Sequence, residues 1–132
     1  MYFKTHFAVQ KIKDSGNDKV WLTERGNTFG YQDLVVDYRN IPAMQKYAPV
    51  VLDITHSLQQ PNQTSGVTGG DPSLIEAIAL SAISTGADGF FIETHPEPEK
   101  ALCDAASQLC VYDFEEFMKP ILELHATEVK WR

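Results

Sequence analysis

Three clusters of ionisable side chains stand directly after short apolar runs of the sequence. In chain order the clusters are Glu24 and Arg25, Asp53 and His56, and Glu93 and His95. Imidazole nitrogen and carboxylate oxygen together can hold a divalent metal. The planar guanidinium of an arginine forms paired hydrogen bonds with a carboxylate or a phosphate. A single charged loop residue is usually only solvated, but the threefold repetition indicates a metal or anion site.

The apolar runs have the composition of buried β-strands. We predict strands over 19–23, 49–54 and 89–92, and a helical pattern follows each strand, over about 41–47, 71–86 and from 113 onward. A short helix is also predicted over 7–14. This alternation predicts a parallel α/β fold, in which right-handed crossovers bring the carboxyl ends of the strands to one side. The three clusters are therefore expected to converge.

Two of the predicted helices carry signals for where they begin. Asp71 followed by Pro72 is typical of an N-cap and a first helical position. In the last helix, Glu116 stands at capping-box spacing from Asp113. The residues that we expect on the buried side of this helix are Phe114, Phe117, Ile121, Leu122 and Leu124.

The segment 59–70 has no apolar periodicity and is rich in Gln, Ser, Thr and Gly. A connection of this length is more often functional or mobile than incidental. Its glycines, Gly66, Gly69 and Gly70, do not form a phosphate-binding motif with a lysine. We expect them to give the loop flexibility.

Composition narrows the classes of protein. With 132 residues the chain has room for one domain and one core. The net charge of −7 argues against a nucleic-acid partner. No apolar run approaches the ~20 residues of a membrane span, and the first residues lack the apolar centre of a secretory signal. Because only two cysteines are present, too few for a disulfide framework, a cytoplasmic location is expected. The spacing of these cysteines does not suit a zinc site.

Four motifs resemble a known enzyme family in sequence and in order. They are Thr-Glu-Arg-Gly-Asn-Thr-Phe-Gly-Tyr at 23–31, Asp-Ile-Thr-His-Ser-Leu-Gln at 53–59, Glu-Thr-His-Pro-Glu-Pro at 93–98 and Cys-Asp-Ala-Ala-Ser-Gln-Leu at 103–109. Together they resemble the 3-deoxy-D-manno-octulosonate 8-phosphate (KDO 8-phosphate) synthases. The resemblance implies a (β/α)₈ barrel transferase. Such an enzyme condenses phosphoenolpyruvate with arabinose 5-phosphate, giving a lipopolysaccharide precursor and inorganic phosphate.

The resemblance also implies roles for five residues. Arg25 matches the arginine that grips phosphoenolpyruvate, and Gln59 falls where the hydroxyls of the sugar are contacted. In the metal-dependent branch of the family a divalent ion is held by a cysteine, a histidine, a glutamate and an aspartate. The last three match His56, Glu93 and Asp104, so His56 is implied to act catalytically as a metal ligand. No organic cofactor is implied.

The chain departs from the family in extent. The match runs from the helix after the fifth strand to the final helix, whereas a whole barrel has ~250 residues. The family's cysteine ligand, its phosphoenolpyruvate-binding lysines and its sugar-phosphate site belong to strands one to five. We therefore expect a partial barrel of about three parallel strands, over 1–132, that is inactive alone. It would need a homo-oligomer or an N-terminal half.

Two alternatives stay open. The first is a non-catalytic half-barrel that binds an anion or a metal, or that self-associates. The second is the related synthase of aromatic biosynthesis, which uses erythrose 4-phosphate. This enzyme shares the barrel and the type of metal site, but the stretches 27–31 and 93–98 fit it less well.

Overall fold

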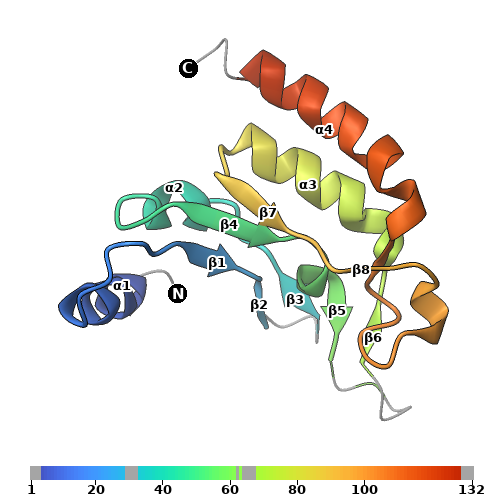
Figure 1. Cartoon of the computed structure of the whole chain (residues 1–132), viewed down its shortest axis with the longest axis horizontal. Helices are drawn as coiled ribbons and strands as arrows, with labels where there is room; N and C mark the ends of the chain where they lie inside the picture. The colour runs from blue at the N-terminus through green and yellow to red at the C-terminus, as the bar shows by residue number, and fades with distance from the viewer. Residues whose placement is uncertain (1–3, 29–32, 62, 64–67, 129–132) are drawn as a thin grey trace.

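Three parallel strands form the centre of the fold. They are β1 (Leu22–Glu24), β4 (Val50–Asp53) and β7 (Gly89–Phe91), in the order β1-β4-β7 (Figure 1). The structure, a computed structural model, describes residues 4–28, 33–61, 63 and 68–128. The predicted strands are confirmed, although the first begins at Leu22 rather than at 19.

Helices follow the strands in the predicted alternation. The α-helices are α1 (Thr5–Asp14), α2 (Asn40–Met44), α3 (Ile75–Ser84) and α4 (Phe114–Glu128). The helix α2 lies between β1 and β4 in the chain, α3 lies between β4 and β7, and α4 comes after β7. Figure 1 shows α3 and α4 side by side along the sheet, and the two helices pack on each other. In the part of the chain that the structure describes, no helix could cross a membrane.

Short elements connect these strands and helices. The two-residue strands are β2 (Asn27–Thr28), β3 (Leu34–Val35), β5 (Gln59–Gln60), β6 (Gly69–Gly70), β8 (Thr94–His95) and β9 (Leu109–Cys110). The 3₁₀ turns cover His56–Leu58, Pro72–Leu74, Pro98–Lys100 and Val111–Asp113. The antiparallel pairs are β2 with β3 and β5 with β6, whereas β8 and β9 are parallel.

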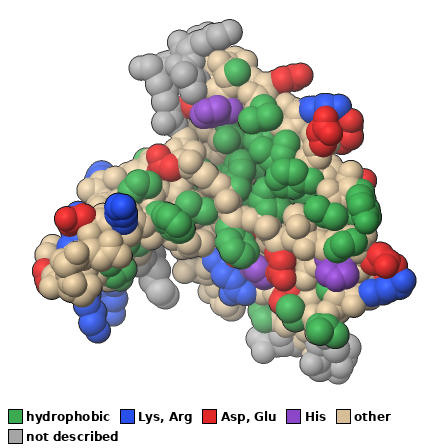
Figure 2. Space-filling view, viewed as in Figure 1, with side chains coloured by type: hydrophobic (Ala, Val, Ile, Leu, Met, Phe, Trp, Pro, Cys, Tyr) green, Lys and Arg blue, Asp and Glu red, His purple; other side chains and the backbone are tan. Residues whose placement is uncertain are grey.

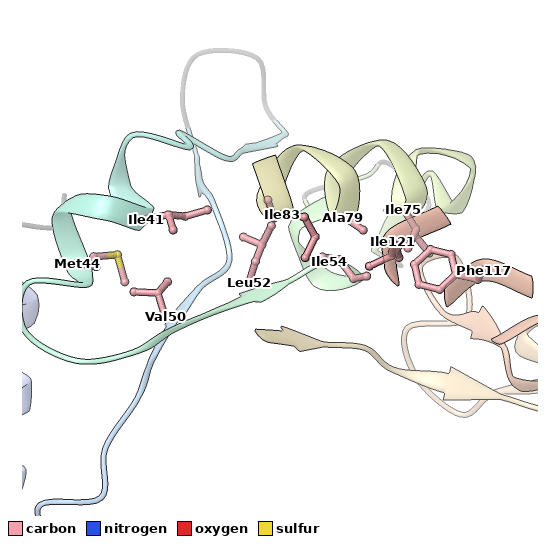
Figure 3. Close-up of a cluster of buried hydrophobic side chains, with 11 residues drawn as sticks. Ile41, Met44, Val50, Leu52, Ile54, Ile75, Ala79, Ile83, Phe117 and Ile121 are labelled. Carbon is pink, nitrogen blue, oxygen red and sulfur yellow. The ribbon is translucent and has the colours of Figure 1, made fainter. Parts of the chain in front are cut away.

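The hydrophobic core lies between β4 and the helices, as Figure 3 shows. Alternate residues of β4 and its extension point into it, and α3 and α4 supply one face each. Fully burying a Val, Leu, Ile, Phe or Met side chain stabilises the folded state by about 1.5–3 kcal/mol. The buried members are Ile41, Met44, Val50, Leu52, Ile54, Ile75, Ala79, Ala82, Ile83, Phe117 and Ile121.

Two details of α4 differ from the prediction. Phe117 and Ile121 are buried as expected, but Phe114 and Leu122 are exposed, because α3 covers only a narrow stripe of α4. Glu116, which was expected to take part in a capping box with Asp113, forms an ion pair with Lys119. The helix is entered through the 3₁₀ turn Val111–Asp113, which replaces an abrupt start at Asp113.

The start of the α3 segment agrees with the prediction. Oδ1 of Asp71 accepts a hydrogen bond from the backbone N–H of Ser73 at 3.1 Å, which is the expected N-cap contact. Pro72 opens a 3₁₀ turn, and α3 continues from Ile75. The cap therefore fixes where the chain turns after β6.

The described ends of the segment 59–70 form two short strands. β5 and β6 pair as a ribbon, with Gln59 opposite Gly70. A Cβ at Gly70 would lie 2.5 Å from the carbonyl oxygen of Ala106. The expectation that Gly70 provides flexibility is therefore wrong, since this glycine permits a close approach of two backbones. Gly66 lies outside the described residues.

Both outer strands of the sheet have a free edge in the described part of the chain. β1 and β7 each pair with β4 alone. Trp21, next to β1, is 68% exposed, and Phe91 of β7 is 48% exposed. Unpaired parallel edges flanked by aromatic side chains are typical of surfaces that another element covers.

Candidate metal and anion site

The site begins at the last residue of β4. Oδ1 of Asp53 accepts hydrogen bonds from the backbone N–H groups of Thr55 (3.2 Å) and His56 (2.9 Å). These contacts fold the chain into the turn His56–Leu58 directly after the strand. The second carboxylate oxygen, Oδ2, lies 2.8 Å from Nδ1 of His56. Asp53 therefore shapes the turn and orients the imidazole ring.

The other imidazole nitrogen faces the end of β7. Nε2 of His56 lies 2.6 Å from Oε2 of Glu93, two residues after β7. The second oxygen of this carboxylate, Oε1, accepts a hydrogen bond from Nε2 of Gln108 at 3.0 Å. The ends of β4 and β7 thus bring one imidazole between two carboxylates, as the sequence predicted for parallel strands.

Asp104 completes a group of three potential ligands. His56, Glu93 and Asp104 each offer one ligand atom, and these atoms all lie within 4.8 Å of one another. Asp104 belongs to the connection between β8 and β9 and has a φ of 51°, in the left-handed region that few residues other than glycine adopt. One nitrogen and two carboxylate oxygens suit a borderline or hard divalent ion. The residues present therefore fit a divalent metal.

Arg25 is joined to this group through Gln59. The guanidinium of Arg25 donates to Oε1 of Gln59, and Nε2 of Gln59 donates to Oδ1 of Asp104. Because one end of the amide meets a donor and the other an acceptor, its orientation is determined. Arg25 itself is exposed. A cationic side chain and the three potential ligands therefore share one hydrogen-bonded network.

The charges around the imidazole favour a cation. Asp53, Glu93 and Asp104 place three carboxylates on or near one histidine. The Asp104 carboxylate raises the pKa of the neighbouring Cys103 thiol above its usual value, with smaller contributions from burial and from the charge of Glu93. Negative charge thus dominates the cluster, while Arg25 supplies positive charge on its border.

The space beside the cluster is open. A pocket of about 430 Å³ is lined by Thr68 and by the segment 101–106, which includes Asp104. Figure 2 shows histidine, basic and acidic side chains next to one another, below a patch of hydrophobic side chains over α3 and the adjoining part of α4. A larger pocket of about 520 Å³ lies between β3 and the start of α2 and contains none of the three ligand residues.

Two residues that were expected to converge have other contacts. Glu24 is buried, and its carboxylate accepts hydrogen bonds from the N–H of Gly26 (2.7 Å) and from Nδ2 of Asn40 (3.0 Å). Nδ1 of His95 accepts a hydrogen bond from the N–H of Glu97 at 2.9 Å. Neither side chain contacts the cluster in these hydrogen bonds. The residues that do converge are Arg25, Asp53, His56 and Glu93.

Sequence reasoning missed the contribution of Gln108. Its amide contacts Glu93 and the carbonyl oxygen of Cys103, next to Asp104. The residue lies within the motif at 103–109, but a glutamine carries no spacing rule that would mark it as part of a metal site. Asp53 was recognised as a strand-end carboxylate, whereas its contact with Nδ1 of His56 required the structure.

The parallel strands with their charged carboxyl ends define this chain as a β/α protein of the barrel class. The structure matches that of phospho-2-dehydro-3-deoxyheptonate aldolase (DAHP synthase) from Thermotoga maritima with a TM-score of 0.81 and 30% identity, over 96% of this chain and 35% of that one. The chain belongs to the DAHP synthetase I family, whose model matches residues 4–129.

Curated relatives support the resemblance seen in the motifs. The chain is 42% identical over 120 residues to a protein of Desulfotalea psychrophila, and 43% identical over 122 residues to one of Nitratidesulfovibrio vulgaris. Both are named 2-dehydro-3-deoxyphosphooctonate aldolase, another name for KDO 8-phosphate synthase. The matches cover 90% and 92% of this chain but 43% and 45% of the relatives. The chain therefore spans less than half their length, and the predicted partial barrel is confirmed.

Proposed function

We propose that this chain carries the part of a KDO 8-phosphate synthase that binds the metal and part of the phosphoenolpyruvate. The reaction would be the condensation of phosphoenolpyruvate with arabinose 5-phosphate to the eight-carbon sugar acid phosphate and inorganic phosphate. The observation that carries the proposal is the meeting of His56, Glu93 and Asp104 within 4.8 Å, joined to Arg25 through Gln59.

Arg25 is the proposed anion-binding group. A guanidinium carries five N–H donors, and the described structure has one of them donate to Gln59. The exposed side chain leaves donors for the carboxylate or phosphate of phosphoenolpyruvate. Held there, the positive charge would also stabilise the phosphate as its bond to carbon breaks. Arg25 is therefore proposed to act both in binding and in catalysis.

His56, Glu93 and Asp104 are the proposed metal ligands. Nε2 of His56 and Oε2 of Glu93 already face each other, and Asp53 fixes the ring from its other side. A bound divalent ion would supply Lewis acidity for orienting water or polarising the aldehyde. Gln59 lies between these ligands and Arg25, where its amide could exchange its present partners for hydroxyls of the sugar.

The proposed enzyme needs more parallel strands than β1, β4 and β7. Both β1 and β7 have unpaired edges, and aromatic side chains lie exposed beside them. We propose that residues 1–132 correspond to the barrel from the helix after strand five to the final helix. Activity would then require complementary strands, from an N-terminal half or from another copy of the chain. A cytoplasmic location would fit the phosphorylated substrates.

The test is phosphate release after reconstitution. The chain is mixed with the portion of the Nitratidesulfovibrio vulgaris relative that it does not cover, and the co-eluting complex receives phosphoenolpyruvate, arabinose 5-phosphate and Mn²⁺. We expect release from the complex, loss of release with Arg25→Ala, and no release from either part alone. Release from the folded chain alone would contradict the requirement for complementary strands. No release from a folded complex would contradict the synthase assignment.

The same assay distinguishes the two sugars. The curated relatives named for the octonate reaction are 42–43% identical to this chain, whereas the heptonate enzyme is 30% identical, and this difference favours arabinose 5-phosphate. We expect the complex to release phosphate faster with arabinose 5-phosphate than with erythrose 4-phosphate. The reverse preference would favour the aromatic-biosynthesis synthase.

A further inference from the structure

We infer that Gln108 is a positioning residue for the metal site, because it holds two of the three proposed ligands in place. This inference rests on the proposed function and adds a residue to it. Gln108 is 6% exposed and lies at the end of the segment that connects β8 to β9. Its side chain touches no proposed substrate group and acts through Glu93 and the backbone beside Asp104.

The amide of Gln108 has a determined orientation. Its Nε2 donates to Oε1 of Glu93 at 3.0 Å and to the carbonyl oxygen of Cys103 at 2.9 Å. Both partners are acceptors, so the reversed amide would place its oxygen against two oxygens. With Oε1 of Glu93 held in this way, Oε2 is the oxygen that faces His56. Gln108 therefore fixes the rotation of the Glu93 carboxylate, so that its other oxygen points toward His56.

The second contact acts on Asp104. The carbonyl oxygen that Gln108 binds belongs to Cys103, directly before Asp104 with its φ of 51°. A non-glycine residue keeps such a conformation only where its surroundings impose it. The N–H of Ser107 donates to the carbonyl oxygen of Asp104 at 2.9 Å and holds the segment from its other side. Gln108 thus helps to keep Asp104 turned toward His56 and Glu93.

One feature argues against a role in stability alone. Oε1 of Gln108 is buried and has no hydrogen-bond partner among the described residues. A buried acceptor without a partner is unfavourable, and such exceptions concentrate at functional sites. The carbonyl end of the Gln108 amide therefore makes no hydrogen bond within the described part of the chain that would stabilise the fold. The Nε2 end makes both hydrogen bonds, and they join the segment of Glu93 to the segment of Asp104.

The chain contains a matched control at the opposite end of the strands. Nε2 of Gln45 donates to the carbonyl oxygen of Gly86 (2.6 Å) and to Oδ2 of Asp88 (2.9 Å), which are again one backbone carbonyl and one carboxylate. Asp88 precedes β7, whereas Glu93 follows it. Gln108→Met and Gln45→Met therefore remove the same two kinds of hydrogen bond, near and far from the proposed ligands.

The experiment measures Mn²⁺ binding to the full chain by calorimetry, and urea unfolding without metal. Both variants should lose stability, but only Gln108→Met should weaken Mn²⁺ binding, by about 10- to 100-fold, the usual effect of losing a group that orients a ligand. Should Gln108→Met not fold, Gln108→Asn keeps the amide on a shorter side chain and should also weaken binding. Equal Mn²⁺ affinity in a folded Gln108 variant and the wild type would overturn the inference.

Two further variants separate this inference from the metal site itself. In a Glu93→Ala background, Gln108→Met should cost less affinity than it does alone, because part of its effect passes through Glu93. Full additivity would overturn the proposed route. If the single variant His56→Ala binds Mn²⁺ as tightly as the wild type does, the metal site of the proposed function is refuted. A site that needs His56 but not Gln108 refutes only the inference.

Discussion

Oδ2 of Asp53 lies 2.8 Å from Nδ1 of His56, and this contact leaves Nε2 as the nitrogen that faces Glu93. A neutral imidazole carries its proton on one nitrogen only, and a carboxylate on Nδ1 favours the proton there. With the proton on Nδ1, Nε2 is the nitrogen that can give its lone pair to a metal in exchange for its present contact with Glu93. The pair Asp53–His56 therefore orients the ring for metal binding.

We predict that Asp53→Asn weakens divalent metal binding about 10- to 100-fold, because the amide no longer favours the proton on Nδ1. Mn²⁺ titration of the chain measures the affinity, and ¹⁵N NMR of the imidazole reports which nitrogen is protonated. Asp88→Asn, at the other end of the sheet, is the control for removing a carboxylate that accepts hydrogen bonds from a backbone N–H and a side chain. Unchanged tautomer and affinity in Asp53→Asn would contradict the assigned role.

Metal removal should lower the stability of the chain. A ligand that binds only the folded state at 100 times its Kd adds about 2.7 kcal/mol. We expect Mn²⁺ to raise Tm, EDTA to reverse the rise, and Asp104→Asn to abolish most of it. Glu97→Gln, which alters an exposed ion pair with Lys100, should respond to Mn²⁺ as the wild type does. The same Mn²⁺ response in Asp104→Asn would exclude Asp104 as a ligand.

Gly70→Ala should destabilise the fold by about 1–3 kcal/mol, because the new methyl would lie 2.5 Å from the carbonyl oxygen of Ala106. Gly89→Ala is the matched control, since its Cβ would have its nearest contact at 3.7 Å, to Val51. Urea unfolding measures both changes. A loss at Gly89 as large as that at Gly70 would show that close approach is not the cause.

Ile121→Ala should cost about 2–5 kcal/mol of unfolding free energy, because Ile121 is fully enclosed between α3 and α4. The neighbouring Leu122 is 57% exposed, so Leu122→Ala should change stability by no more than about 0.5 kcal/mol. Thermal and urea unfolding provide the comparison. Similar losses in the two variants would mean that α4 presents a different face to the core.

Stability should also fall in alkaline solution through Tyr38. Burial raises the pKa of its phenol above the ordinary 10.0, although a hydrogen bond with Ser81 opposes the rise. The folded state therefore holds the proton more tightly than the unfolded state does. Its contribution is complete below pH 10 and is lost as the pH rises through the folded-state pKa.

Urea unfolding between pH 8 and 11.5 tests this expectation. Tyr38→Phe should flatten the alkaline decline, because the group that titrates is removed. Tyr112→Phe, at a side chain that is 78% exposed, should keep the slope of the wild type. Identical slopes in all three proteins would assign the decline to other groups.

Local signals in the sequence predicted the elements well. Asp71 and Pro72 gave the helix start, and the apolar runs gave the three strands, because capping and strand formation depend on residues close in the chain. Prediction failed for side chains whose burial depends on how neighbouring elements pack. Phe114 and Leu122 share the apolar pattern of α4 but lie outside the stripe that α3 covers.

The candidate site divides in the same way. The motifs named Arg25, His56, Gln59, Glu93 and Asp104, and the strand ends predicted that most of them converge. The links between them join residues far apart, such as Arg25 to Gln59 over 34 positions and Gln59 to Asp104 over 45. Glu24 shows the limit, since its position resembles that of Arg25 and yet its side chain is buried against Asn40.

The sequence by itself determined the family, the strand–helix order and the residue types at the ends of the strands, because these are properties of short segments. Only the tertiary structure decided that Asp53 orients His56, that Gln108 holds Glu93, and that Gly70 permits the approach of Ala106. Each of the last two depends on backbones from separate segments meeting within a few ångströms. Packing of the whole fold sets such distances, and no local pattern encodes them.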